Sequence, residues 1–378
     1  MNQVWGNITG NDDNPRTLVV VFLRGGTDGL TLVPPIGDSD YWRKRPVIAV
    51  NENTIVRLEG EKRFGLHPLL AGLTEPYSNG DLAVIHCVGS EDSTRSHFEV
   101  QDLMEHGGVN TPGGWLGRFL RARQGIKTGP LSAMAFSKSI PECLRGAPSV
   151  TVLESLDDFF LGKNMDQFIE QLEFLYGRWQ KNTALQHTGM DTMRTMRCIE
   201  KFERKSYQPE NGAEYGDHSF SRGLSQVAQL IKTKVGLDVA SVDLNGWDSH
   251  WAQDMLMNQL IPELSQGLQA FYHDLGRKRM ETVSVVVMTE FGRRLYMNSS
   301  LGTNHGRGNV MFVMGGGVKD DRVLSDWKGL KDDVLEGKGD LPVTTNYRNV
   351  LVPILERHGT HDLSGVFPEH ELSPLLDL

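Results

Sequence analysis

Residues 17–23 read TLVVVFL and are followed by Arg24-Gly25-Gly26. A continuous run of apolar, β-branched residues is typical of a strand that is buried on both faces, as the strands of a parallel sheet are. The two glycines after the run allow the backbone to approach a ligand closely. This stretch therefore predicts a buried parallel strand that ends in a ligand-binding loop.

Similar apolar runs recur along the chain, and segments with helical periodicity separate them. Strands are predicted at 81–87 (DLAVIHC), 235–244, 282–288 (TVSVVVM) and 310–314 (VMFVM), and helices at 254–276 and 347–358. This alternation predicts an α/β fold, with a mostly parallel central sheet and helices on both faces. Residues 153–234 have helical periodicity without strand signals, and we expect them to form a helical insertion or cap within a single domain over residues 1–378.

Composition narrows the expected partners and the compartment. The formal net charge is −9 and no long basic run is present, so neither nucleic acid nor an anionic membrane is an expected partner. No apolar run approaches the roughly 20 residues of a membrane helix. Residues 1–15 lack the basic and then apolar pattern of a secretory signal, so the chain as written is expected to be cytoplasmic unless a signal has been trimmed from it.

Polar clusters follow the predicted strands. In an open parallel sheet, ligands bind in the crevice beyond the carboxyl ends of the strands. Clusters that follow strands are therefore expected to meet at one edge of the sheet. The five clusters are residues 24–28, 93–97, 245–250, 290–293 and, less directly after a strand, 304–307.

Asp248, His250 and His305 are the main candidates for metal ligands. Asp248 and His250 flank Ser249 in a loop, so a carboxylate oxygen and an imidazole nitrogen could bind the same cation, and His305 has small neighbours that leave room for a ligand. Two histidines, one aspartate and an open position suit zinc or a similar divalent ion. The alternative is a helix cap with a hydrogen-bonded histidine and no metal.

Asp28 and Glu290 also follow predicted strands, and each is a candidate cation ligand. Glu290 could instead act as a general base. Arg24 and Arg293 are candidates for binding an anionic substrate, because a guanidinium group can donate two parallel hydrogen bonds to an anion. The alternatives are that Asp28 belongs to a turn and that Glu290 and Arg293 form an ion pair.

Ser96 and His97 lie at the predicted start of a helix. The amino end of a helix favours an anion beside it, which makes Ser96 a candidate nucleophile. Ser96 and Glu99 also have the spacing of a capping box, so a purely structural role fits as well. His97 could be a base, a metal ligand or a hydrogen-bonding group that orients another residue.

Several blocks of the sequence resemble the DUF1501 family of uncharacterised bacterial proteins. The blocks extend from about residue 18 to residue 368 and include FLRGGTDGLTLVPP, STRSHFEVQDLMEHG, NGWDSH, TEFGRR and GTNHGRGNVMFVMGGGV. The family resembles a branch of the alkaline phosphatase and sulfatase superfamily. This resemblance implies an alkaline phosphatase-like fold with one or two divalent metals, zinc or manganese, at the carboxyl edge of the sheet.

The resemblance also implies roles for individual residues. Asp28 matches the acid after the first strand of the superfamily, and Ser96 lies roughly where the nucleophile is. Asp248, His250 and His305 look like the ligands of the first metal.

The sequence departs from the superfamily pattern at Phe291 and from the DUF1501 pattern at Asn304 and Asn346. Phe291, next to Glu290, replaces a histidine ligand, so the second metal site is incomplete. Asn304 and Asn346 stand where aspartate is expected, and an amide is a weaker cation ligand than a carboxylate. The resemblance therefore implies one metal rather than two, or none.

The leading hypothesis is a metal-dependent hydrolase of a phosphate or sulfate ester, acting on an anionic small molecule or a glycan. The alternative is an accessory protein that binds an anion or a glycan on a hydrolase-like scaffold without turnover. A third possibility is a tailoring enzyme for a peptide or small metabolite. The sequence leaves the substrate and the oligomeric state open.

Overall fold

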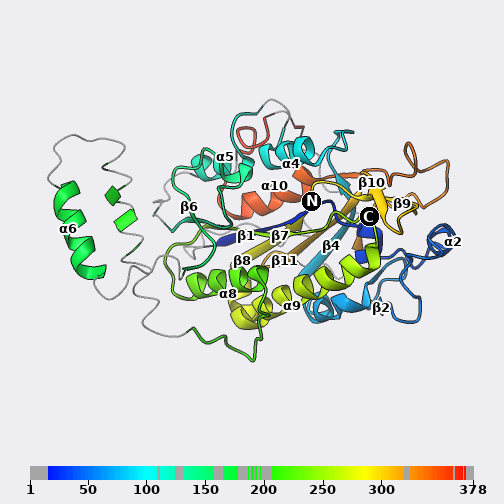
Figure 1. Cartoon of the computed structure of the whole chain (residues 1–378), viewed down its shortest axis with the longest axis horizontal. Coiled ribbons are helices and arrows are strands. Elements are labelled where there is room, and N and C mark those ends of the chain that lie inside the picture. The colour runs from blue at the N-terminus through cyan, green and yellow to red at the C-terminus, as the bar shows by residue number, and fades with distance from the viewer. Residues whose placement is uncertain are drawn as a thin grey trace.

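A mixed sheet occupies the centre of the molecule (Figure 1). The computed structural model describes residues 16–108, 111–123, 129, 131–156, 165–177, 186, 189–190, 192–193, 196, 207–318, 323–360, 362–368 and 370–371. Within these residues the sheet has nine strands, in the order β12-β4-β11-β8-β1-β7-β5-β6, and β13 pairs with β4. The strands are β1 (Thr17–Arg24), β4 (Leu82–Gly89), β5 (Ala133–Phe136), β6 (Thr151–Leu153), β7 (Val239–Asn245), β8 (Val283–Met288), β11 (Asn309–Gly315), β12 (Val323–Leu324) and β13 (Thr345–Asn346).

Strand β1 is the middle of the parallel part of the sheet. It pairs in parallel with β7 on one side, where Val20 lies opposite Ser241, and with β8 on the other, where Val20 lies opposite Val286. Alternate side chains of β1 enter different cores: Val19 and Val21 pack in the core under one face, and Leu18 and Val20 in the core under the other. Burial on both faces explains the uninterrupted apolar run.

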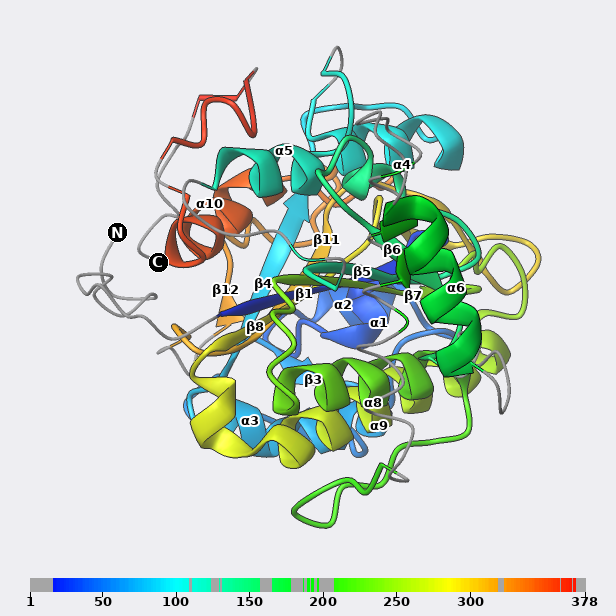
Figure 2. The same ribbon diagram turned by 90° about the vertical axis from the view of Figure 1, so that its left-hand side faces the viewer.

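Helices cover both faces of the sheet, as predicted (Figure 2). One face is covered by η1 (Pro68–Leu73), α3 (Thr74–Ser78), α8 (Ser219–Lys232) and α9 (Gln253–Met280). The other is covered by α4 (His97–His106), α5 (Trp115–Ala122) and α10 (Tyr347–Arg357). The predicted α/β architecture is therefore confirmed.

Strand β11 runs antiparallel to both of its neighbours, β4 and β8, whereas the other pairings of the large sheet are parallel. The segment between β8 and β11 holds only the hairpin of β9 (Arg293–Met297) and β10 (Thr303–His305). Without a crossover helix, the chain returns along the sheet in the opposite direction. The beginning of β11 therefore lies at the carboxyl edge of the parallel strands, and residues 304–307 lie there with it.

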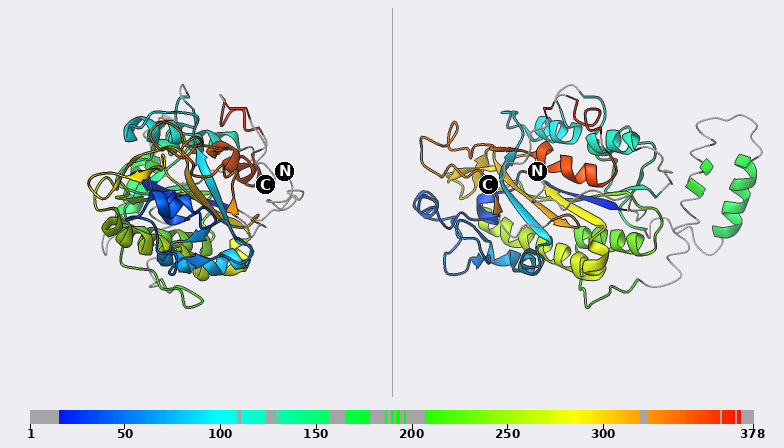
Figure 3. Two further views of the ribbon diagram at one scale, coloured as in Figure 1. Left: turned by 90° about the vertical axis from the view of Figure 1, so that its right-hand side faces the viewer. Right: turned by 180° about the vertical axis from the view of Figure 1, so that it is seen from behind.

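The remaining described elements lie around this layered body. They are α1 (Gly29–Leu32), α2 (Asp40–Lys44), the two-stranded sheet of β2 (Val56–Arg57) and β3 (Gly65–Leu66), η2 (Glu142–Leu144) and α6 (Met165–Gly177). Of the predicted insertion at 153–234, α8 packs on α9 and β7 in the main body, and α6 stands apart from it (Figure 3). Other parts of this segment lie outside the described residues. No described helix is both long and apolar enough to cross a membrane.

Candidate metal centre

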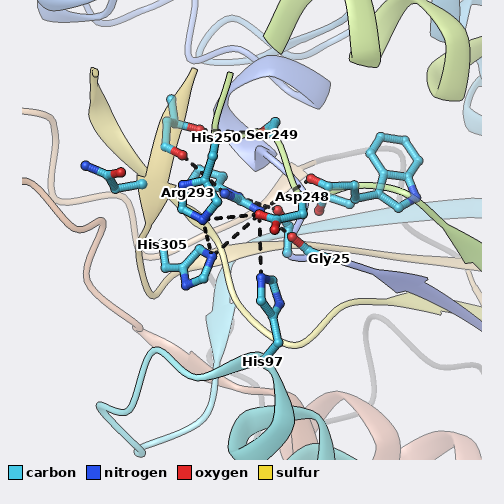
Figure 4. Close-up of polar contacts among 12 residues, drawn as sticks. Gly25, His97, Asp248, Ser249, His250, Arg293 and His305 are labelled. Atoms are coloured by element: carbon cyan, nitrogen blue, oxygen red, sulfur yellow. Dashed lines mark hydrogen bonds and ion pairs between the residues drawn. The ribbon is translucent and has the colours of Figure 1, made fainter. Parts of the chain in front are cut away.

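Four side chains converge at the carboxyl edge of the sheet (Figure 4). His97 begins α4, Asp248 and His250 lie in the loop after β7, and His305 ends β10. One potential ligand atom from each residue lies within 4.8 Å of the other three. Three segments that are far apart in the sequence thus supply three imidazoles and one carboxylate to one point.

The spacing of these atoms fits a single small cation. Asp248 Oδ1 lies 3.5 Å from His97 Nε2, 3.3 Å from His250 Nε2 and 3.6 Å from His305 Nε2. Four ligands at metal–ligand distances of ~2.0–2.1 Å in a tetrahedron would be separated from one another by about 3.3 Å. The two Nε2 atoms of His250 and His305 are closer, at 2.7 Å.

Hydrogen bonds at Nδ1, the ring nitrogen that faces away from the centre of the cluster, orient two of the imidazoles. His97 Nδ1 lies 2.8 Å from Glu290 Oε1, and His305 Nδ1 lies 2.7 Å from the carbonyl oxygen of Arg95. Because both partners are acceptors, each Nδ1 must donate a proton, and in the neutral ring the Nε2 lone pair then faces the centre. Carboxylate and carbonyl partners of this kind are typical of histidines that bind metals.

The surroundings of the two histidines shift their pKa values in opposite directions. The hydrogen bond to Glu290 raises the pKa of His97. Burial lowers the pKa of His305, which favours its neutral form. His97 Nε2 is buried and has no hydrogen-bond partner among the described residues. This nitrogen is therefore placed to bind a ligand that the protein itself does not supply.

Asp248 is held by Arg293, whose side chain is almost fully buried. Arg293 donates to Asp248 Oδ1 at 2.7 Å, to the carbonyl oxygen of Gly26 at 2.6 Å and to that of Thr303 at 3.2 Å, and it also donates to the carbonyl oxygen of Gly25. Partial burial alone would raise the pKa of Asp248, but the hydrogen bond and charge of Arg293 lower it below its ordinary value. The structure thus gives Arg293 contacts within the protein, where the sequence had suggested an anion clamp.

Glu290 lies behind His97 and is 1% exposed. Its Oε1 accepts hydrogen bonds from Gly25 N at 2.8 Å and Gln101 Nε2 at 2.9 Å in addition to that from His97. Burial alone would raise the pKa of Glu290, but these three hydrogen bonds lower it by more, so the pKa lies below its ordinary value. The structure therefore places Glu290 behind the cluster, in contact with His97, and not among the four converging side chains.

Two other predicted residues are also engaged elsewhere. Asp28 is fully buried, and it binds Arg45 at 2.6 Å and Gln253 Nε2 at 2.6 Å while capping the first turn of α1. Arg24 binds Asp243 at 2.7 Å and Glu105 at 3.0 Å. Neither residue belongs to the converging cluster.

Ser96 lies where the sequence predicts it, at the position before the first residue of α4. Its side chain makes no capping hydrogen bond, so the structural alternative suggested by its spacing with Glu99 is not realised in this form. It immediately precedes His97, a member of the cluster. A role for Ser96 as nucleophile remains a prediction.

Phe291 closes one side of the cluster. Its ring centroid lies 4.9 Å from that of His97 and 4.6 Å from that of His305. The ring also packs so closely on Gly26 that a Cβ atom there would lie 2.4 Å from it. The space beside His97 and His305 on this side of the cluster is thus filled by an apolar ring.

No sequence pattern pointed to Gln253, the first residue of α9, which is fully buried behind the cluster. Its Oε1 accepts from Thr303 Oγ1 at 2.6 Å and from Ser249 Oγ at 3.2 Å. Ser249 lies between two members of the cluster, and Thr303 lies two residues before a third. Gln253 therefore connects the loop after β7 to the β9–β10 hairpin.

Comparisons with known proteins identify a family and a set of solved structures. The model of DUF1501, described as a protein of unknown function, matches residues 88–360. No curated protein matches the sequence.

Solved structures are similar at low identity. The chain is 12% identical to the PH0037 protein from Pyrococcus horikoshii, covering 95% of this chain and 99% of that chain with a TM-score of 0.37. It is 10% identical to the alkaline phosphatase from the Antarctic bacterium TAB5, covering 92% and 100% with a TM-score of 0.36. It is 10% identical to BT1596, a 2-O GAG sulfatase, covering 96% and 76% with a TM-score of 0.41.

Proposed function

This chain belongs to the DUF1501 family, which has no assigned function, and we propose that it is a metal-dependent hydrolase of phosphate or sulfate esters. The main support is the convergence of His97, Asp248, His250 and His305 on one point. This point lies at the carboxyl edge of a parallel sheet, where α/β proteins bind their ligands. Asp248 and His250 are 48% and 41% exposed, so a substrate can reach the cluster.

The residues fit one divalent cation, zinc or manganese. Three imidazole nitrogens and one carboxylate oxygen are a donor set that suits such ions. A buried nitrogen without a partner costs about 1–3 kcal/mol, and a cation bound to His97 Nε2 would remove that cost. Phe291 fills the adjacent space and Glu290 is already satisfied by hydrogen bonds, so we infer one cation and not two.

A bound cation would supply Lewis-acid chemistry, polarising an ester oxygen and stabilising negative charge. The chain's own residues would prepare the site for it. Arg293 keeps Asp248 ionised, and Glu290 orients the His97 ring. We propose that the Ser96 hydroxyl, or a water molecule in its place, attacks the phosphorus or sulfur atom. Overall, the bond between the phosphorus or sulfur atom and the ester oxygen breaks. The ester oxygen takes a proton from water and leaves as an alcohol, and the hydroxyl group of that water stays on the phosphorus or sulfur atom.

The alternative, a binding protein without turnover, is favoured by one observation. Arg24 and Arg293, the two predicted anion clamps, both have protein partners, so neither has a guanidinium group free for an ester anion. The two proposals differ in turnover and agree on anion binding at the metal centre.

The test compares metal content and hydrolysis in the same preparations. The chain would be stripped with a chelator and reloaded with zinc or manganese. Bound metal would be measured by mass spectrometry, and turnover with 4-nitrophenyl phosphate and 4-nitrophenyl sulfate. We expect about one metal per chain, with metal and turnover both lost in His250→Ala. His218→Ala is the control, because His218 is an exposed histidine that pairs with Glu263 away from the cluster.

Two results would contradict the proposal in different ways. If His250→Ala keeps its metal and its activity, the cluster is not the site. If the wild-type chain binds one metal but hydrolyses neither ester, the hydrolase assignment fails and the binding protein is preferred.

A further inference from the structure

A cavity of about 520 Å³ lies next to the metal centre. It is lined by residues at the carboxyl ends of β1, β5 and β7 and by the side of α4. Gln101 connects the two sites, because it lines the cavity and donates to the same Glu290 oxygen that binds His97. The volume lies in the range of small-molecule sites, ~300–1,000 Å³. The cavity is therefore large enough for the part of a substrate that lies beyond the reacting ester.

Acidic side chains outnumber basic ones in the wall of this cavity. The carboxylates are those of Asp102, Glu105, Glu142, Glu154 and Asp243. The basic side chains are those of Arg24 and Lys138. Arg24 is fully used, because its guanidinium group binds both Asp243 and Glu105. Glu142 is also paired, with Arg145 Nε at 2.6 Å, and the five carboxylates still outnumber Arg24, Lys138 and Arg145. The cavity wall is thus negative, unlike a site built for a second anionic group.

Asp243 is a largely buried member of this wall and is bound by Arg24. Its Oδ2 accepts from Arg24 Nε at 2.7 Å, whereas its Oδ1 is buried and has no hydrogen-bond partner among the described residues. Burial raises the pKa of Asp243, but the other four carboxylates still outnumber the two basic side chains without it. A ligand that carries a positive charge would offset the excess charge of the wall.

We infer that the cavity binds a protonated amine on the part of the substrate remote from the ester. The inference rests on the proposed function, because the metal centre would hold the ester group. A substrate with one anionic ester and one amine has charges that complement both sites. A second anionic group would be repelled by the wall of the cavity.

The experiment uses three alkyl phosphates that share the reacting group and differ at the other end. They are 2-aminoethyl phosphate, propyl phosphate and 2-carboxyethyl phosphate, or the matching sulfates if only sulfate esters react. We expect kcat/KM of the metal-loaded chain to fall in that order, with roughly tenfold or more between the first and the last. The ratio of the amino to the propyl ester should decrease in the double variant Asp102→Asn, Glu154→Gln, which removes the two exposed acids of the wall.

Glu59→Gln is the matched control, because Glu59 is exposed and does not line the cavity. It should retain the preference of the wild-type chain. Equal kcat/KM for the three esters would overturn the amine subsite and leave the hydrolase intact. The same conclusion would follow if the double variant kept the full preference.

Direct binding separates this inference from the proposed function if no ester is hydrolysed. Isothermal titration calorimetry with 1,3-diaminopropane would then be done on the metal-loaded wild-type chain and on the double variant. Binding that is weakened in the double variant would support the amine subsite even though the hydrolase proposal had failed. Absence of binding to the wild-type chain would overturn it.

Discussion

Replacing Glu290 with glutamine would test whether the residues behind the cluster prepare it for a metal. The substitution keeps the size of the side chain and removes its charge. Glu290 Oε1 accepts three hydrogen bonds, and that from His97 Nδ1 is 2.8 Å long. A neutral amide oxygen is a weaker acceptor, so the His97 ring would be held less firmly and its Nε2 would be a weaker donor to a metal.

Changes to such partners of metal-binding histidines typically weaken metal affinity 10–100-fold. This corresponds to about 1.4–2.7 kcal/mol of binding free energy. Glu290 is 1% exposed, so water cannot readily replace the lost interaction, and we expect the Kd for zinc to rise by an amount in this range.

The assay is a competition titration of zinc against a chromophoric chelator, with circular dichroism to confirm that the variant is folded. Glu263→Gln is a matched control, because Glu263 makes a similar 2.9 Å pair with His218, away from the cluster. Its zinc affinity should equal that of the wild-type chain. If Glu290→Gln binds zinc as tightly as the wild type, then Glu290 does not prepare the site, and the reasoning is wrong.

Three further substitutions give separate tests. Ser96→Ala should lower kcat on 4-nitrophenyl phosphate or sulfate by ~100-fold or more if Ser96 is the nucleophile, with metal content unchanged; an unchanged kcat would assign the attack to water. Gln253→Leu removes the hydrogen bonds that this side chain makes with the buried Asp28, Thr303 and Ser249 and should lower the free energy of unfolding by roughly 2–4 kcal/mol in urea titrations; a loss below about 0.5 kcal/mol would contradict the assigned contacts. Burial lowers the pKa of His86 to about 4, so as pH falls the imidazole is protonated in the unfolded chain before it is protonated in the folded one. The free energy of unfolding should therefore decrease from about pH 6.5 to pH 4, by at most about 3 kcal/mol from this residue. Urea titrations across this range should show a smaller decrease for His86→Gln, and an identical pH dependence in both chains would refute the assignment.

The parallel strands of the sheet could be predicted from the sequence because burial on both faces restricts the residue types that such a strand can contain. Every position of a run such as 282–288 must be apolar or small, so the run itself reveals the strand. The direction of β11 could not be predicted in this way, because an apolar run is compatible with a parallel or an antiparallel strand. The absence of helical periodicity between residues 289 and 308 was the available signal, because a parallel return needs a crossover.

The candidate site was only partly predictable for a related reason. Asp248 and His250 lie in the loop after β7, His97 begins α4 and His305 ends β10, and each of these segments follows a strand or precedes β11, at one edge of the sheet. Asp28 follows β1 in the same way, yet its carboxylate is bound by Arg45 and Gln253. Gln253 is 225 residues away in the sequence, and no local pattern shows such a pairing.

The role of Arg293 shows how the loops of the site can be held together before any ligand binds. Its one guanidinium group donates to carbonyl oxygens of the β1 loop, to the β9–β10 hairpin and to Asp248. Burying a cation is costly unless its donors are satisfied, and here the carbonyls and the carboxylate satisfy them. An arginine that instead bound the substrate would leave these loops without a common partner. The geometry therefore favours positive charge from a bound cation at the centre, with Arg293 keeping Asp248 ionised and in place.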